Sequence, residues 1–306
     1  MSDAAFQREL RELLAERVAF DVPMARHTSL RVGGPVDALA TPADRAELAA
    51  LLSLCKRRGW PQRVLGSGFN LLVRDEGLDG VAIRLSRFRA LVVLPGPRVH
   101  AEAGVSHASL TGLCARQGLA GLEFGAGIPG TVGGWLAMNA GIGTREVRDV
   151  VESVELLVPG EQATRTVEAG ALEFRYRELR STAPGAVLVA ARFVVEPSSP
   201  EAVQHAMDEL LARRTATQPL DVPSCGSVFK NPEGDFAGRL IEQAGLKGER
   251  EGGAEISTIH ANFIVNRGGA RACDVLALIE RARRSVAEHS GVMLEPEVRI
   301  LGRSAT

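Results

Sequence analysis

Hydrophobic positions along the chain follow two spacings, and each predicts its own kind of element. Apolar residues that recur every three or four positions are typical of amphipathic helices, whereas short alternating or continuous apolar runs are typical of strands. The first spacing predicts helices over residues 6–18, from the Thr41-Pro42 cap to Gly59, and over 106–117, 202–214, 236–244 and 273–288. The second predicts strands over residues 63–65, 71–73, 81–85, 90–94, 99–103, 150–158, 187–195, 263–265 and 298–301.

The order of these elements divides the chain into two parts. A helix followed by strands and a loop predicts a small α/β unit in the N-terminal half. The run Pro197-Ser198-Ser199-Pro200 is the clearest linker, because clusters of proline and serine mark loops between regular elements. Beyond it, mixed helices and strands predict a compact α+β domain of about one hundred residues.

Glycine is concentrated between residues 125 and 141, in the sequence GAGIPGTVGGWLAMNAG. Each glycine inside regular structure costs roughly 0.5–1 kcal/mol relative to alanine, so this stretch is kept for something other than stability. Glycines let backbone N–H groups approach an anion closely, and pyrophosphate is a frequent partner of such loops. A set of tight turns with no ligand is the alternative.

Two known patterns were compared with this stretch. Gly125, Gly127 and Gly130 have the G-x-G-x-x-G spacing of a Rossmann loop, but the residues before them are too short for a convincing strand. The phosphate-binding NTPase loop is rejected, because Thr131 and Val132 stand where it needs Lys and Ser/Thr. A second glycine loop, residues 66–70, follows an apolar run. Two separated loops favour a long dinucleotide such as FAD.

Composition excludes several classes of function. Lys and Arg number 36 and Asp and Glu 37, which gives a net charge of −1, and only 4% of residues are aromatic, so we expect no nucleic-acid partner. The N-terminus lacks the pattern of a secretory signal and no apolar run is long enough for a bilayer, so we expect a cytoplasmic protein that does not engage a membrane. Four scattered cysteines and six scattered histidines show no ligand spacing, and we expect no metal.

Three polar residues stand in unusual local contexts. Ser227 lies in a Gly/Pro-bounded turn before a helix, where a capping role is the alternative. Arg177 follows the only tyrosine, Tyr176, and suits carboxylate or phosphate binding, although an isolated arginine on a strand is usually solvated. Glu297 enters the last strand, where acidic residues are depleted. Composition alone does not favour a functional role over a structural one for any of these three residues.

Together the motifs resemble the UDP-N-acetylenolpyruvoylglucosamine reductase family, and they occur in the family's order across nearly the whole chain from His27. The matching segments are HTSLRVGG (27–34), VLGSGFNLLV (64–73), GIPGTVGG (127–134), MNAG (138–141), YR (176–177), QPL with PSCGSVFKNP (218–232), GRLIEQAGLKG (238–248), HANFIVN (260–266) and LEPEVRILG (294–302).

This resemblance implies an α+β fold with a two-part FAD-binding domain of the vanillyl-alcohol-oxidase type, followed by a smaller α+β substrate-binding domain. The implied segments are an N-terminal helix (1–25), two FAD-binding subdomains (26–92 and 93–197) and the substrate domain (198–306). The implied activity is reduction of UDP-N-acetylglucosamine enolpyruvate to UDP-N-acetylmuramate for peptidoglycan synthesis, with non-covalent FAD and with NADPH as hydride donor. We expect a monomer of the shorter class, which lacks the long substrate-closing insertion.

The resemblance also implies site residues. Ser227 corresponds to the proton donor, and Arg177 and Glu297 to the groups that polarise and orient the enol carboxylate. Tyr176, Lys230 and Asn231 correspond to the substrate pocket. The residues implied to bind FAD are Gly66, Ser67, Gly68, Asn70, Leu71, Gly127, Ile128, Pro129, Gly130, Thr131, Gly133, Gly134, Asn139 and Gly141.

Some positions depart from the family. Residues 142–145 replace a Tyr-Gly-Gly run of many relatives, and Thr217 stands where some have lysine. Cys225, two residues from Ser227, is interpreted as structural. Three alternatives stay open: an FAD-dependent oxidase of the same fold acting on a small alcohol or hydroxy acid, a non-catalytic nucleotide-sugar sensor, and a Rossmann dehydrogenase without flavin.

Overall fold

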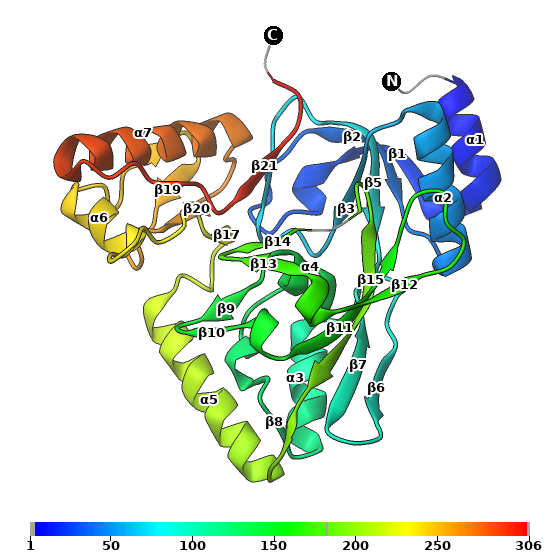
Figure 1. Cartoon of the computed structure of the whole chain (residues 1–306). Coiled ribbons are helices and arrows are strands. Elements are labelled where there is room, and N and C mark those ends of the chain that lie inside the picture. The colour runs from blue at the N-terminus through cyan, green and yellow to red at the C-terminus, as the bar shows by residue number, and fades with distance from the viewer. Residues whose placement is uncertain (1–3, 181–182, 305–306) are drawn as a thin grey trace. The chain divides into compact units, whose positions relative to one another are not determined.

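A computed structural model describes residues 4–180 and 183–304 of the chain (Figure 1). Its packing divides the chain into two compact units, each built from three separate segments. Unit 1 comprises Met1–Phe20, Ala38–Ser67 and Gly80–Arg213, and unit 2 comprises Asp21–Asp37, Gly68–Asp79 and Arg214–Thr306. The boundaries between these units differ from the predicted segment boundaries after residues 25, 92 and 197. The four-segment organisation stays a prediction, because packing alone does not show how a chain divides by function.

The chain contains both longer helices and single 3₁₀ turns. The α-helices are α1 (Ala4–Leu14), α2 (Arg45–Arg58), α3 (His107–Arg116), α4 (Val132–Ala137), α5 (Pro200–Thr217), α6 (Ala237–Gln243) and α7 (Ala272–Ser290). The 3₁₀ turns are Ala15–Arg17, Met24–Arg26, Glu123–Gly125, Val147–Asp149 and Ala169–Ala171.

Unit 1 is organised around two sheets. The larger is antiparallel with strand order β12 (Arg165–Glu168), β11 (Val151–Leu157), β15 (Val187–Val194), β7 (Arg98–Glu102) and β6 (Leu91–Leu94). The second, most of whose residues belong to unit 1, has the order β1 (Val18–Pro23), β2 (Pro35–Ala40), β5 (Leu78–Arg84) and β3 (Gln62–Leu65), in which β3 and β5 are parallel. Unit 1 also contains three separate two-stranded pairs: β9 (Gly141–Ile142) with β10 (Arg145–Glu146), β13 (Glu173–Arg175) with β14 (Glu178–Arg180), and β8 (Leu119–Ala120) with β16 (Glu196–Pro197).

Helices α1 and α2 cover the second sheet of unit 1. Leu10 of α1 and Leu51 and Leu52 of α2 pack in one buried cluster with Val81 and Ile83 of β5. Their three- and four-residue spacing places these side chains on one face of each helix. Burial of one such side chain contributes about 1.5–3 kcal/mol, so this cluster fixes β5, whose C-terminal end borders the site described below.

Unit 2 is a small α+β unit. Its antiparallel sheet has the order β17 (Ser224–Ser227), β20 (Phe263–Asn266), β19 (Ala254–Ile256) and β18 (Arg250–Glu251), and β4 (Leu71–Val73) pairs in parallel with β21 (Arg299–Leu301). Helices α6 and α7 lie against the sheet (Figure 1), with Leu278 of α7 and Ile241 of α6 buried beside Ile256. The hydrophobic periodicity therefore predicted the helices of this unit correctly.

Several predicted boundaries are wrong for local reasons. The first helix ends at Leu14, not at residue 18, because Ala15 has a φ of 51° and the chain enters β1. Helix α2 begins after Asp44, whose carboxylate accepts the N–H of Glu47 at 2.9 Å, whereas the N–H of Thr41 donates to the carbonyl of Arg17. The strands β1, β2 and β12 were not predicted, since their alternation is short and interrupted by prolines and charges.

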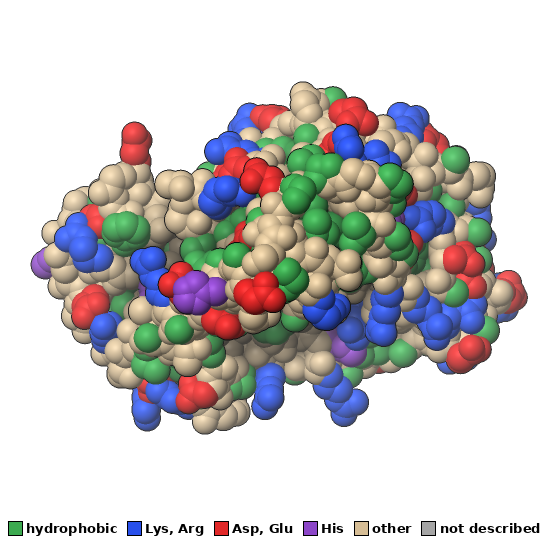
Figure 2. Space-filling model, turned by 90° about the horizontal axis from the view of Figure 1, so that it is seen from below, with side chains coloured by type: hydrophobic (Ala, Val, Ile, Leu, Met, Phe, Trp, Pro, Cys, Tyr) green, Lys and Arg blue, Asp and Glu red, His purple; other side chains and the backbone are tan. Residues whose placement is uncertain are grey.

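Charge is distributed in both signs over the surface. Figure 2 shows Lys and Arg side chains next to Asp and Glu side chains on one face, in keeping with the net charge of −1. Among residues 4–180 and 183–304, no helix is both apolar enough and long enough to cross a bilayer.

Candidate active site

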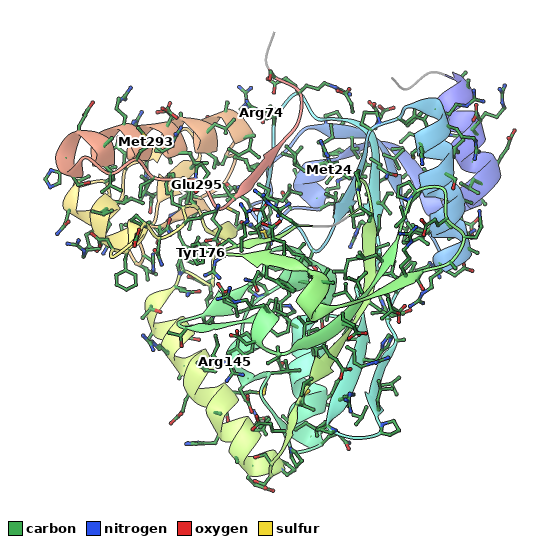
Figure 3. All side chains as sticks on the ribbon, viewed as in Figure 1. Met24, Arg74, Arg145, Tyr176, Met293 and Glu295 are labelled. Carbon is green, nitrogen blue, oxygen red and sulfur yellow. The ribbon has the colours of Figure 1, made fainter. Side chains whose placement is uncertain are left out.

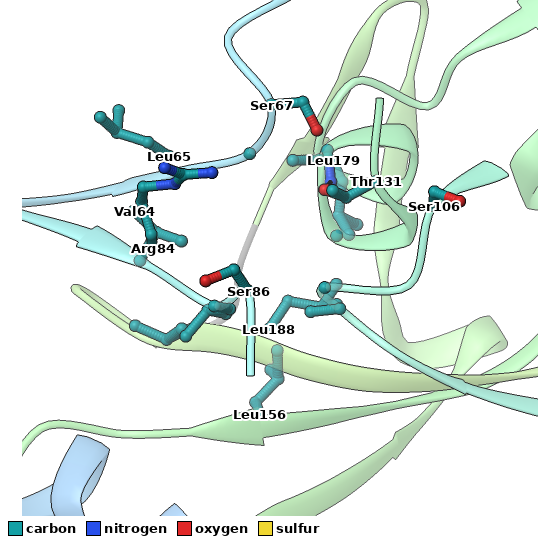
Figure 4. A pocket seen from close by; sticks show the side chains of 18 of the residues that line it. Val64, Leu65, Ser67, Arg84, Ser86, Ser106, Thr131, Leu156, Leu179 and Leu188 are labelled. Atoms are coloured by element: carbon teal, nitrogen blue, oxygen red, sulfur yellow. Dashed lines mark hydrogen bonds between the residues drawn. The ribbon is translucent and has the colours of Figure 1, made fainter. Parts of the chain in front are cut away.

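A cavity of about 370 Å³ lies within unit 1, beside the C-terminal ends of β3 and β5 (Figure 4). One wall is aliphatic and another is polar, with serine and threonine hydroxyls and two guanidinium groups. The aliphatic and glycine lining is Val64, Leu65, Gly66, Leu85, Ala103, Gly104, Gly133, Gly134, Ala137, Leu156, Leu172, Leu179, Ala186, Val187 and Leu188. The polar lining is Ser67, Arg84, Ser86, Arg89, Ser106 and Thr131. Such a lining suits a ligand with both a ring system and phosphate groups.

Glycines at the cavity allow close backbone approach. A Cβ on Gly133 would lie 3.0 Å from the Cβ of Ala103 and 3.2 Å from its carbonyl oxygen. A Cβ on Gly66 would lie 3.1 Å from the Thr131 hydroxyl. Thr131 caps α4, its Oγ1 accepting the N–H of Gly134. The two glycine loops found in the sequence therefore meet here, and a side chain at Gly66 or Gly133 would press against the neighbouring Thr131 or Ala103.

Only part of the predicted FAD set borders this cavity. Five of the predicted residues line it, namely Gly66, Ser67, Thr131, Gly133 and Gly134. Six others in unit 1 are outside the lining that the described residues form: Gly127, Ile128, Pro129, Gly130, Asn139 and Gly141. Gly68, Asn70 and Leu71 belong to unit 2. All fourteen assignments stay predictions.

Some lining residues were missed by sequence reasoning. Arg84 is the last residue of β5, and Ser86 and Arg89 lie in the segment that follows it. A strand end is a frequent ligand site, so a polar cluster there was a usable signal. Ser106 was recognised only as a helix cap, and it does accept the N–H of Ser109. The aliphatic wall comes from strands and loops far apart in the chain, and no local pattern marks it.

Tyr176 and Arg177 form the two-residue turn between β13 and β14, with Arg175 paired to Glu178 (Figures 1 and 3). Arg177 therefore lies in a turn and not on a strand. Arg177 has a φ of 59°, and its guanidinium lies 4.8 Å from the centre of the Tyr176 ring. A non-glycine residue in this conformation costs of order 1–3 kcal/mol and often marks a functional position.

Ser227 and Glu297 are brought together in unit 2. Ser227 ends β17 opposite Phe263, and the preceding Gly226 has a φ of 77° at an irregularity in the strand pairing. The prediction of a turn is therefore corrected to a bulged strand. The backbone N–H of Glu297 donates to the carbonyl of Val228, next to Ser227, at 2.7 Å. The side-chain amide of Asn70 donates to the carbonyl of Glu297 at 3.1 Å.

The predicted substrate residues of unit 2 lie just beyond this pair. Lys230 forms an ion pair with Glu295, and its N–H donates to the carbonyl of Glu295 at 2.9 Å. The side-chain Oδ1 of Asn231 accepts the N–H of Ala237 at the start of α6. Both residues are thus anchored to elements that flank Ser227 and Glu297.

Cys225 is buried in the core of unit 2. Burial raises the pKa of its thiol to about 12, and the negative charge of Glu297 adds to this rise. A thiol with so high a pKa is protonated at neutral pH and unreactive. Its packing agrees with the structural interpretation of Cys225.

Comparisons with known proteins agree with these features. The family profile for the FAD binding domain matches residues 35–166, and that for the UDP-N-acetylenolpyruvoylglucosamine reductase C-terminal domain matches residues 218–301. The UDP-N-acetylenolpyruvoylglucosamine reductase of Geobacter metallireducens is 48% identical over 99% of both chains. That of Rubrobacter xylanophilus is 43% identical, again over 99% of both chains. The crystal structure of the reductase from Thermus caldophilus is 39% identical with a TM-score of 0.79, and covers 92% of this chain and 97% of its own.

Proposed function

The chain belongs to the UDP-N-acetylenolpyruvoylglucosamine reductase family, and we infer from this membership and from the glycine-lined cavity how its residues act. It is an FAD-containing oxidoreductase of α+β fold, with an FAD-binding domain ahead of the reductase C-terminal domain. We propose that it reduces the enolpyruvyl group of UDP-N-acetylglucosamine enolpyruvate with NADPH. The full-length match to reductases carries this proposal.

The residues of the unit 1 cavity fit FAD. We propose that Gly66, Gly133 and Gly134 let the backbone approach the pyrophosphate, and that the hydroxyls of Ser67 and Thr131, which line the cavity, donate to it. The guanidinium groups of Arg84 and Arg89 supply positive charge, and the aliphatic wall suits a ring system. Bound FAD supplies hydride transfer from NADPH to the enolpyruvyl methylene carbon.

Three side chains are proposed to handle the charge that develops on the substrate. Hydride addition leaves a negative charge over the α-carbon and the carboxylate, and the Ser227 hydroxyl gives the α-carbon its proton. Arg177 binds the carboxylate through its planar guanidinium, and Glu297 orients the enol. A positioned general acid contributes about 10²–10⁴ in rate, equivalent to roughly 3–5 kcal/mol of barrier.

Three further residues are proposed to bind the nucleotide sugar. Tyr176 is exposed at the tip of its hairpin, and Lys230 and Asn231 stand beside Ser227 in the chain. A monomeric, cytoplasmic enzyme without a nucleic-acid partner is part of the same proposal. Size-exclusion chromatography and cell fractionation test those expectations.

The visible absorption spectrum under anaerobic conditions tests the function directly. We expect a flavin band that bleaches with NADPH and returns when the enolpyruvyl sugar is added. A band that bleaches but does not return with that sugar would show that the protein is a flavoprotein but that this sugar is not its substrate. A protein that shows no flavin band after incubation with FAD and removal of the unbound FAD would contradict the assignment of the cavity.

The oxidase alternative is disfavoured by the C-terminal half. Residues 218–301 match the reductase C-terminal domain, and Ser227 and Glu297 both lie in that range. Return of the reduced flavin's band with oxygen alone, at a rate that the enolpyruvyl sugar does not change, would revive that alternative.

A further inference from the structure

Asn139 is a fully buried polar residue whose side chain has three hydrogen bonds inside unit 1. Its Nδ2 donates to Oε2 of Glu146 at 2.8 Å and to the carbonyl of Arg175 at 2.9 Å. Its Oδ1 accepts the N–H of Arg148 at 3.1 Å. Both donors of the amide are thereby used within the protein. Asn139 was predicted to bind FAD, yet this geometry directs its side chain to the protein itself.

Glu146 holds the other side of this contact. Its carboxylate is also 3.0 Å from Nε of Arg148, and its side chain is nearly buried. Its N–H donates to the carboxylate of Asp149 at 2.8 Å, and its backbone pairs with Gly141 across β9 and β10. A charged acceptor strengthens the hydrogen bond from Asn139, because charge-assisted bonds are roughly twice as strong as neutral ones.

The bond from Asn139 to the Arg175 carbonyl connects the segment around Asn139 to the Tyr176-Arg177 turn. Arg175 is the last residue of β13, and the next two residues are Tyr176 and Arg177. A hydrogen bond to the Arg175 carbonyl therefore fixes the backbone at the point where the turn begins. Asn139 itself has a φ of 40° and Arg177 one of 59°. The buried amide of one left-handed residue, Asn139, thus bonds to the residue two positions before the other, Arg177.

We propose that Asn139, held by the Glu146 carboxylate, is a positioning residue that sets the conformation of the Tyr176-Arg177 turn and is not itself a contact of the cofactor. The inference rests on the proposed function in one respect only, namely the expected effect on the rate of reoxidation by the enolpyruvyl sugar. Loss of the amide would let the turn move, while the pairing of Leu179 with Phe174 in the same hairpin keeps Leu179 in the lining of the unit 1 cavity. Misplacement of a substrate-binding group by about 1 Å costs on the order of 100-fold in rate.

The first test uses Asn139→Gly, which keeps the left-handed backbone accessible and removes the amide. We expect the affinity for FAD, titrated into the apoprotein, to stay within about twofold of wild type, and flavin reduction by NADPH to be unchanged. We expect reoxidation by the enolpyruvyl sugar to be about 10- to 100-fold slower. Loss of FAD affinity by tenfold or more, with normal reoxidation of the saturated enzyme, would overturn the proposal.

A double variant of Asn139 and Arg177 distinguishes a positioning role of Asn139 from a general structural role. We expect Asn139→Gly combined with Arg177→Ala to be no slower than Arg177→Ala alone, because both changes remove the same interaction. A double variant whose reoxidation is slowed by the product of the two single effects would contradict the proposal. Arg180→Ala is the matched control, since Arg180 lies at the open end of the same hairpin and pairs with Glu178. It should leave reoxidation within about twofold of wild type.

Tyr176 gives a readout that needs no substrate, because it is the only tyrosine of the chain. With 3-fluorotyrosine incorporated, its single ¹⁹F resonance should shift or broaden in Asn139→Gly and stay unchanged in Arg180→Ala. An unchanged resonance in Asn139→Gly would refute positioning, even if the wild type proved unable to use the enolpyruvyl sugar. Failure of wild-type reoxidation would refute the proposed function alone.

Glu146→Gln is the second variant, in case Asn139→Gly does not fold. It keeps an acceptor for Asn139 but removes the charge, so the effect should be smaller and in the same direction, about threefold or more on reoxidation. Unchanged reoxidation together with an unchanged Tyr176 resonance in Glu146→Gln would count against the proposal.

Discussion

The backbone N–H of Glu297 donates a 2.7 Å hydrogen bond to the carbonyl of Val228. Residues almost seventy positions apart are thereby joined next to Ser227, and the bond depends on backbone atoms alone. Substitution of the Ser227 or Glu297 side chain should therefore leave this junction intact. The chemical role of either side chain is accessible to mutation without loss of the fold.

Replacement of Ser227 by alanine should separate the two half-reactions. We expect reduction by NADPH to be unchanged and reoxidation by the enolpyruvyl sugar to slow by about 10²–10⁴, because only the second step needs the proton. Stopped-flow absorbance at the flavin band measures both rates. Ser224→Ala is the matched control on the same strand, since the carbonyl of Ser224, not its hydroxyl, accepts the bond from Ser29. Equal losses in both half-reactions would refute the role of Ser227.

Two neighbouring glycines of α4 should respond differently to alanine. Gly133→Ala places a Cβ 3.0 Å from that of Ala103, whereas Gly134→Ala meets nothing nearer than 3.6 Å. We expect Gly133→Ala to lower the free energy of unfolding by about 1–3 kcal/mol through overpacking. Gly134→Ala should raise it by up to about 1 kcal/mol through helix propensity. Urea unfolding of the FAD-free protein measures both, and equal effects would contradict the packing argument.

Several helices and part of the cavity lining were predictable from the sequence, for identifiable reasons. The amphipathic helix around Leu278 and the capped helix after Ser106 follow from local spacing and capping. Gly66 and Thr131 were recognised because glycine-rich segments are unusual and matched a known family in order. Predictions of this kind depend on signals that are contiguous in the chain.

The parts that were missed depend on contacts distant in sequence. The aliphatic wall containing Leu156 and Leu188 is assembled by strand pairing, and no local pattern distinguishes it from ordinary core. The positive φ of Arg177 and the burial of Asn139 are also invisible in the sequence, because tertiary packing imposes them. Motif matching assigned Asn139 to FAD, whereas its hydrogen bonds go to protein atoms.

An ion-pair cluster near the C-terminus should contribute to stability. The Arg303 guanidinium contacts the buried carboxylate of Asp37 at 2.7 Å and the exposed one of Asp79 at 2.6 Å. Arg303→Met would remove this charged hydrogen bond from the buried Asp37 carboxylate, and we expect a loss of about 1.5–3 kcal/mol in unfolding free energy. Asp79→Asn, the exposed partner, should cost about 1 kcal/mol or less. Similar losses in the two variants, measured by chemical denaturation, would contradict this ranking.

Buried thiols should make the fold sensitive to alkali. Burial raises the pKa of Cys225 and of Cys114 to about 12 and that of Cys55 to about 11, from an ordinary value of 9.0. Above pH 9 the unfolded chain releases thiol protons that the folded chain keeps, so the stability is complete below pH 9 and falls as the pH rises toward 12.

Each thiol should contribute a slope on the order of 1 kcal/mol per pH unit in that window. Cys225→Ala should show a shallower decline between pH 9 and pH 11 than the wild type, although its stability at pH 7 is lower because of the cavity left behind. Urea unfolding at several pH values measures the two slopes. Parallel curves for wild type and variant would show that Cys225 ionises equally in both states, contrary to its burial.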